Sequence, residues 1–97
     1  LPTAVVCASD RIAVGVLDTL RRAGVGVPAD VSVTGYDDST LARLANVDLT
    51  TVSQQPRAQA DRAIADVVSR LDGGRTERVS STLVPELVVR TTTGPPS

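Results

Sequence analysis

Residues 4–8, Ala-Val-Val-Cys-Ala, form a continuous apolar run that stops abruptly at the polar side chains of Ser9 and Asp10. The run is too short and too uniformly apolar for an amphipathic helix, and it is typical of a strand covered on both faces. Asp10 is the predicted N-cap of a following helix, because its carboxylate can accept hydrogen bonds from the free amides of the first turn. The chain is thus expected to run from a buried strand directly into a helix.

A second strand follows this helix at the spacing of a βαβ unit. Apolar residues recur at helical intervals over 13–20, and Gly24 stands where the chain must turn left-handed. Residues 31–36 read as a strand that ends at Asp37-Asp38. Strands joined by a helix in this way are parallel with a right-handed crossover. The sequence therefore predicts an α/β fold with a parallel sheet.

The second half of the chain continues this pattern less regularly. Residues 39–48 form a link with one helical turn at 41–44, and residues 49–53 are a third, more polar strand that runs into Gln54-Gln55. Pro56 suits the first turn of a second helix, because its missing amide costs nothing there.

That second helix carries an apolar stripe made by Ala60, Ile64, Val67, Val68 and Leu71. Residues 79–90 are β-like with Pro85 inside them, which predicts an edge strand or two short strands with a break. Residues 91–97 are polar and are expected to fray.

Composition limits the function. Ninety-seven residues suit one domain, and a chain that starts at Leu1 without any Met is expected to be a piece of a longer protein. The absence of His rules out imidazole-dependent catalysis within this segment.

All ten basic residues are arginines, and a net charge of −1 without a basic patch argues against direct nucleic-acid binding. Cys7, the single cysteine, is predicted to be a buried structural thiol, and no stretch is long and apolar enough to span a membrane.

Polar residues follow each of the first three strands. These are Ser9-Asp10, Asp37-Asp38 and Gln54-Gln55, with no cationic residue in the motifs. In open parallel sheets, ligands bind beyond the carboxyl ends of the strands, and carboxylates with amides suit polyhydroxylated ligands. Each pair also has a structural interpretation: a helix cap, a turn, or solvated residues before a proline. Their shared position favours a binding site.

Acidic residues at strand ends are also found in Mg²⁺-dependent phosphoryl-transfer domains. Such sites usually include a Lys that pairs with the phosphoryl oxygens, and this sequence has none. No glycine-rich phosphate loop follows the first strand either. We therefore expect no metal, no cofactor and no enzymatic activity.

The order of these segments resembles the C-terminal part of the regulatory domain of lactose-repressor/galactose-repressor-type (LacI/GalR) transcription factors. The resemblance covers nearly the whole chain and rests on residues 3–10, 13–17, 20–24, 27–33, 35–38, 49–54 and 85–92. It implies a periplasmic-binding-protein-like (type I) fold, with two α/β subdomains and a small effector, a sugar or related molecule, held between them. It also implies a cytoplasmic, homodimeric regulator whose helix-turn-helix head, absent from this chain, binds operator DNA.

The resemblance divides the chain between two lobes. Residues 1–48 would belong mainly to the C-terminal subdomain, and residues 49–54 would cross to the other lobe. Residues 55–78 would form a helix of the N-terminal subdomain, and residues 79–97 the return strand and tail. The effector would then regulate operator binding by changing how the lobes are arranged.

Carried over position by position, the resemblance assigns effector contacts to Asp37, Gln54 and Ser9. The family commonly has Asn at the position of Ser9, so this shorter side chain lacks the amide donor. The family's dimer contacts fall on Val14 and on Leu41, Leu44 and Ala45, which ordinary packing within one chain would also explain.

An extracytoplasmic sugar-binding protein of a transport system would share the fold. The patterns at 49–52 and 87–91 resemble the regulators more closely.

Overall fold

The computed structural model describes residues 1–73 and 83–96. The predicted βαβ unit is confirmed: β1 pairs in parallel with β2, with Val5 opposite Val33. An isolated parallel bridge between Thr34 and Thr50 places the start of the third strand segment beside β2. In chain order the elements are β1 (Ala4–Val6), α1 (Asp10–Arg22), β2 (Ser32–Thr34), α2 (Thr40–Arg43), β3 (Thr51–Ser53), α3 (Pro56–Asp72) and β4 (Glu86–Val88).

The hydrophobic core lies where α1 and α2 pack near the parallel strands. Its members are valines, leucines, alanines and one cysteine, in keeping with a sequence that has no Phe, Trp or Met. Cys7 is buried as predicted, and this burial raises the pKa of its thiol above 9.0. The core residues are Cys7, Ala13, Leu17, Val31, Val33, Ala42, Val47 and Leu49.

Two expectations about this first half are wrong. Ser9, not Asp10, is the N-cap of α1: its backbone is extended and its Oγ accepts a hydrogen bond from the Ile12 amide at 3.2 Å. The strand β1 is covered on one face only, since Val6 is 82% exposed whereas Cys7 is buried. The left-handed turn after α1 is confirmed, because Gly24 has a φ of 75°.

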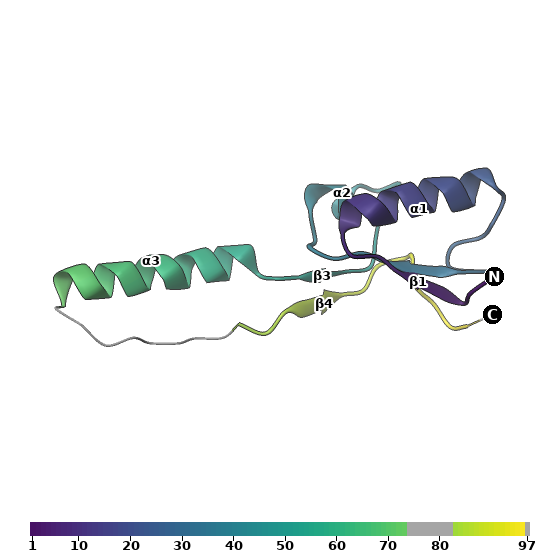
Figure 1. The fold of residues 1–97 in the computed structure, drawn as a ribbon. Coiled ribbons are helices and arrows are strands. Elements are labelled where there is room, and N and C mark those ends of the chain that lie inside the picture. Colours follow the sequence, from purple (N-terminus) through teal and green to yellow (C-terminus); the bar gives the residue numbers. More distant parts are fainter. Residues whose placement is uncertain (74–82, 97) are drawn as a thin grey trace.

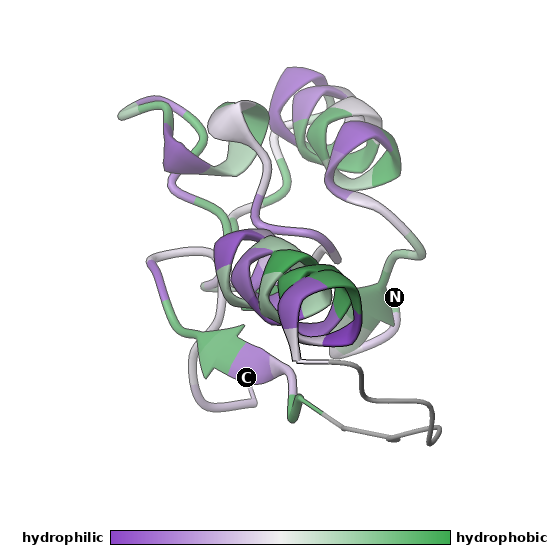
Figure 2. Cartoon of the chain, turned by 90° about the vertical axis from the view of Figure 1, so that its left-hand side faces the viewer, coloured by the Kyte–Doolittle hydropathy of each residue, from purple (hydrophilic) through white to green (hydrophobic). Residues whose placement is uncertain are grey.

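The second half of the chain extends away from this core. Strands β3 and β4 pair antiparallel as a two-stranded ribbon, which leads to α3 at the far end of an elongated molecule, 61 × 22 × 16 Å (Figure 1). Helix α3 begins at Pro56, as predicted. None of its residues is buried, and its apolar stripe is exposed, with Ile64 at 62% and Leu71 at 79%. Seen along its axis, α3 has hydrophobic and hydrophilic residues on different sides (Figure 2).

The C-terminal segment is better anchored than its sequence suggests. Strand β4 follows Pro85, in agreement with the predicted break, whereas residues 79–82 lie outside the described residues, as do 74–78. The expectation that the tail frays from residue 91 is wrong, because Thr92 is 1% exposed and its hydroxyl donates to the Val33 carbonyl at 2.7 Å. Within the described segments, no helix is long and apolar enough to cross a membrane.

Candidate functional site

Two of the predicted site residues meet at the ends of β2 and β3. The backbone amide of Asp37 donates to the Val52 carbonyl at 2.8 Å, which ties the loop after β2 to β3. The Gln54 side chain extends from the end of β3 and donates from Nε2 to Asp37 Oδ1 in a long hydrogen bond of 3.5 Å. Asp37 is exposed and Gln54 is half-buried, so a carboxylate and an amide stand side by side within reach of a ligand.

The backbone that carries Asp37 is strained. Asp37 has a φ of 118° and Asp38 a φ of 52°, values that L-residues seldom adopt. Such conformations cost free energy and persist where surrounding contacts hold them, often at binding sites. Here the holding contacts include the Asp37 amide bond to β3 and an Asp38 amide that donates to Thr51 Oγ1 at 3.3 Å.

Asp38 has two cationic partners that its sequence neighbourhood does not reveal. Arg90 Nη2 lies 2.8 Å from Asp38 Oδ1, and Arg43 Nη2 lies 3.1 Å from Oδ2. Partial burial alone would raise the pKa of Asp38, but the hydrogen bonds and charges of the two arginines outweigh it and hold this pKa below 3.8. The motifs themselves contain no cationic residue, and the two arginines reach Asp38 from α2 and from the segment after β4.

Asp10 is part of the scaffold beneath the site. Its carboxylate is buried, with Oδ1 accepting from the Thr51 hydroxyl at 2.6 Å and Oδ2 from the Ser39 amide at 2.6 Å. A Cβ atom added at Gly35 would overlap Asp10 Oδ1, so this position accepts only glycine without rearrangement. Asp10 thus fixes the loop that carries Asp37 and Asp38, a role that its place before a helix did not indicate.

Ser9, the third predicted effector contact, lies at the N-terminus of α1 and is half-buried. Its Oγ accepts a hydrogen bond from the Ile12 amide. The hydroxyl proton of Ser9 is not used in that bond and can be donated to another group. Within the described residues, its hydrogen bond runs into α1 and does not reach Asp37 or Gln54. The structure therefore joins two of the three predicted residues directly.

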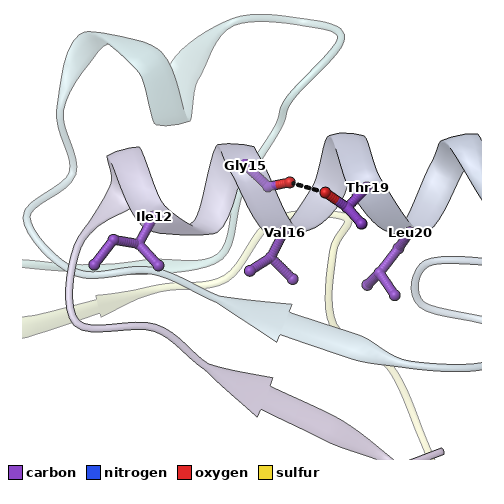
Figure 3. Close-up of a pocket in the computed structure, with 5 residues that line it drawn as sticks. All are labelled: Ile12, Gly15, Val16, Thr19 and Leu20. Atoms are coloured by element: carbon purple, nitrogen blue, oxygen red, sulfur yellow. Dashed lines mark hydrogen bonds between the residues drawn. The ribbon is translucent and has the colours of Figure 1, made fainter.

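A separate hollow of about 420 Å³ lies against α1. Ile12, Val16 and Leu20 line it along one side of the helix, together with Gly15 and Thr19 (Figure 3). The Thr19 hydroxyl is engaged with the Gly15 carbonyl at 2.9 Å. Thr19 carries the one polar side chain among these five lining residues, so the hollow is mainly apolar.

The predicted dimer contacts differ in exposure. Val14 is half-buried and packs against the core, whereas Leu41 is 37% exposed and Leu44 45% exposed. Ala45 is exposed beside them. Apolar side chains around α2 are therefore available for contact, and their role in a dimer stays a prediction.

The phosphoryl-transfer alternative would need carboxylates that are free to bind Mg²⁺. Among residues 1–73 and 83–96, no three His, Cys, Asp or Glu side chains come together as metal ligands. Asp38 is instead neutralised by two guanidinium groups, which compete with a divalent cation for its oxygens.

Comparison with known proteins identifies the family. The profile of the periplasmic binding protein-like domain matches residues 1–93. The chain is 41% identical over 91 residues to the HTH-type transcriptional regulator MalR of Streptomyces coelicolor, covering 94% of this chain and 26% of that protein. It is 37% identical over 91 residues to the HTH-type transcriptional repressor PurR of Vibrio parahaemolyticus, with coverages of 94% and 27%. The chain thus spans about a quarter of the length of these curated relatives.

Comparison with solved structures points to the same family of proteins. A LacI transcriptional regulator from a Rhodococcus species superposes with a TM-score of 0.85 at 50% identity, over 97% of this chain and 34% of that one. A LacI family regulator from Lactobacillus casei with bound sucrose gives 0.78 at 38% identity, over 95% and 34%. The lac repressor dimer bound to operator and the anti-inducer ONPF gives 0.81 at 32% identity, over 96% and 32%. The chain therefore belongs to the periplasmic binding protein-like domain family, in the form found in LacI-type transcriptional regulators.

Proposed function

We propose that this chain is part of the effector-sensing domain of a bacterial DNA-binding transcriptional regulator, with a sugar or a related small molecule as effector. The observation that carries the proposal is the meeting of Asp37 and Gln54 beyond the ends of β2 and β3. The carboxylate accepts hydrogen bonds from ligand hydroxyls, and the amide both donates and accepts. A relative with bound sucrose supports a sugar as the ligand class.

In this proposal Asp37 is the main acceptor for the effector. The long 3.5 Å bond from Gln54 is weak, so a ligand hydroxyl can replace it at little cost. Ser9 is the third contact and donates its hydroxyl proton directly or through a water molecule, since its side chain is shorter than an asparagine.

The lobe assignment supplies the mechanism. Residues 1–48 form most of one subdomain, residues 49–54 cross to the other, residues 55–78 add a helix there, and residues 79–97 return. The antiparallel pairing of β3 with β4, which runs between the α1 region and α3, supports this assignment (Figure 1). Gln54 lies at the crossover, so an effector that touches it can favour one lobe arrangement over another.

The regulator acts in the cytoplasm as a homodimer, catalyses no reaction, and contacts operator DNA through a helix-turn-helix domain outside this chain. Relatives that are HTH-type regulators, and a lac repressor dimer bound to operator, support these partners. The dimer contacts are Val14 in α1 and Leu41, Leu44 and Ala45 around α2.

A thermal-shift screen of the full-length protein against mono- and disaccharides tests the proposal. A ligand at about 100 times its dissociation constant stabilises the native state by about 2.7 kcal/mol, which shifts the melting temperature by several degrees. The sugar that stabilises the protein should also change its affinity for fragments selected from genomic DNA. Sugar binding without any change in DNA affinity would contradict the regulatory role, and no stabilisation by any sugar would contradict the ligand class.

A further inference from the structure

Arg90 joins three segments that meet beneath Asp37. Its Nη2 binds Asp38 at 2.8 Å, its Nη1 donates to the Leu49 carbonyl at 2.9 Å, and its backbone amide donates to Thr50 Oγ1 at 2.9 Å. Arg90, which lies in the return segment (residues 83–96 as described), is therefore hydrogen-bonded both to the loop after β2 and to the residues that lead into β3. A guanidinium can do this because its donors form a planar fork.

The contact with Asp38 is well shielded from solvent. The Asp38 side chain is 9% exposed and that of Arg90 is 17% exposed, whereas the other partner, Arg43, is 64% exposed. Exposed ion pairs contribute little to stability, while a short charge-assisted hydrogen bond between shielded groups contributes more. Of the two arginines, Arg90 is thus the one that can hold the Asp38 side chain in place.

The return segment is itself fixed to the core just beyond Arg90. The Thr92 hydroxyl accepts from the Thr50 amide at 2.9 Å and donates to the Val33 carbonyl at 2.7 Å. Thr92 is 1% exposed, so these bonds are sheltered. The backbone next to Arg90 is therefore held against the core by hydrogen bonds.

The loop after β2, which Arg90 contacts through Asp38, has a strained backbone that surrounding contacts must hold in place. Asp37 and Asp38 both have positive φ angles, and the direction of the Asp37 carboxylate depends on that strained backbone. We infer that Arg90 is a positioning residue of the effector site: through Asp38 it holds Asp37 in the binding geometry and links that geometry to the return segment. This inference rests on the proposed function only for the identity of the site.

The test compares three variants of the full-length protein: Arg90→Gln, Asp38→Asn and the matched control Arg43→Gln. Hydrogen exchange at the Asp37 and Asp38 amides reports the loop without any ligand. We expect Arg90→Gln and Asp38→Asn each to raise exchange there at least tenfold, and Arg43→Gln less than twofold. Asp38→Asn keeps the side chain's shape, so it decides the question even where Arg90→Gln does not fold.

Calorimetry with cellobiose and sucrose forms the second arm. Arg90→Gln should weaken binding of whichever sugar the wild-type protein binds about tenfold, and Arg90→Lys, which keeps the charge, should recover part of that loss. Unchanged exchange at Asp37 and Asp38, or equal effects of Arg90→Gln and Arg43→Gln, would overturn the positioning role. If neither sugar binds the wild-type protein, these two disaccharides are excluded as the effector, while the exchange result still decides the role of Arg90.

Discussion

The Oδ1 atom of Asp10 accepts a 2.6 Å hydrogen bond from the hydroxyl of Thr51, which joins the start of α1 to the start of β3 across 41 residues of chain. Both residues are buried, Asp10 at 2% exposed and Thr51 at 0%. The other oxygen of Asp10 accepts from the Ser39 amide. A single carboxylate therefore positions the loop that leads into α2 and the strand β3, which is followed directly by Gln54.

Removing this carboxylate should destabilise the protein. In Asp10→Ala the Thr51 hydroxyl and the Ser39 amide lose their acceptor, and unsatisfied buried donors cost about 1–3 kcal/mol each. We expect a loss of at least about 2 kcal/mol in the free energy of unfolding, measured by urea denaturation. Thr51→Val, which keeps the shape, removes the hydroxyl that bonds Asp10 Oδ1 and the Asp38 amide and should also destabilise the protein. Equal stability of Asp10→Ala and the wild-type protein would show that water replaces both bonds.

Gly35 should tolerate no side chain. A Cβ atom there would overlap Asp10 Oδ1 and approach Leu49 Cδ2 to 2.7 Å. Because overpacking of this kind costs about 1–3 kcal/mol, Gly35→Ala should lower the free energy of unfolding by that amount. Gly15→Ala is the matched control, since a Cβ atom at Gly15 in α1 meets nothing within 4 Å. It should stabilise the protein by about 0.5–1 kcal/mol through helix propensity, and a loss at both positions would point to a different cause.

Stability should fall in acid because of Asp38. Its pKa in the folded protein lies below the ordinary value of 3.8, so the unfolded chain takes up a proton first as the pH drops. The contribution of the ion pairs is thus fully present above about pH 4 and is lost as the pH falls through the folded pKa. Melting temperatures between about pH 6 and pH 3 should show a shallower acid decline in Asp38→Asn than in the wild-type protein. Parallel curves would assign the decline to other carboxylates.

Ser9 should matter for stability as a helix cap. Its Oγ accepts from the Ile12 amide, and loss of an N-cap side chain costs about 0.5–2 kcal/mol. Ser9→Ala should therefore lower the melting temperature by several degrees, whereas Ser9→Asp, which keeps an acceptor, should nearly preserve it. A Ser9→Ala variant as stable as the wild-type protein would leave effector contact as the remaining role of this side chain.

Local patterns in the sequence were sufficient to predict the helices α1 and α3 and the pairing of the first two strands. Apolar spacing over 13–20 predicted α1, Pro56 predicted the start of α3, and the parallel pairing of β1 with β2 followed from the βαβ order. These features depend on residues a few positions apart, whose hydrogen bonds and side-chain faces are set by the backbone period.

The contacts that hold the site were not predictable in this way. Asp10 reaches Ser39 and Thr51 across 29 and 41 residues, and Asp38 reaches Arg90 across 52. Such pairs depend on how the elements pack, and no spacing rule connects them. The one local signal was the position of Arg90, a charged residue directly after the apolar residues 87–89. The N-cap of α1 could not be predicted from local sequence either, because Ser and Asp are both favourable at this position. In the structure Asp10 accepts a hydrogen bond from Thr51, and Ser9 is the N-cap.

Asp37 provides the decisive test of the site. Its carboxylate is exposed beside Gln54, so its removal should leave the core intact and deprive the effector of a charged acceptor. Loss of one charge-assisted hydrogen bond corresponds to about 1.4 kcal/mol, or roughly a tenfold weaker affinity. We expect Asp37→Ala in the full-length protein to weaken effector binding at least about tenfold by calorimetry, with an unchanged circular dichroism spectrum. Gln54→Ala should weaken binding less, because a neutral amide contributes less than a carboxylate. Unchanged affinity in a folded Asp37→Ala variant would remove Asp37 from the site and leave its contact with Gln54 as a purely structural feature of the crossover.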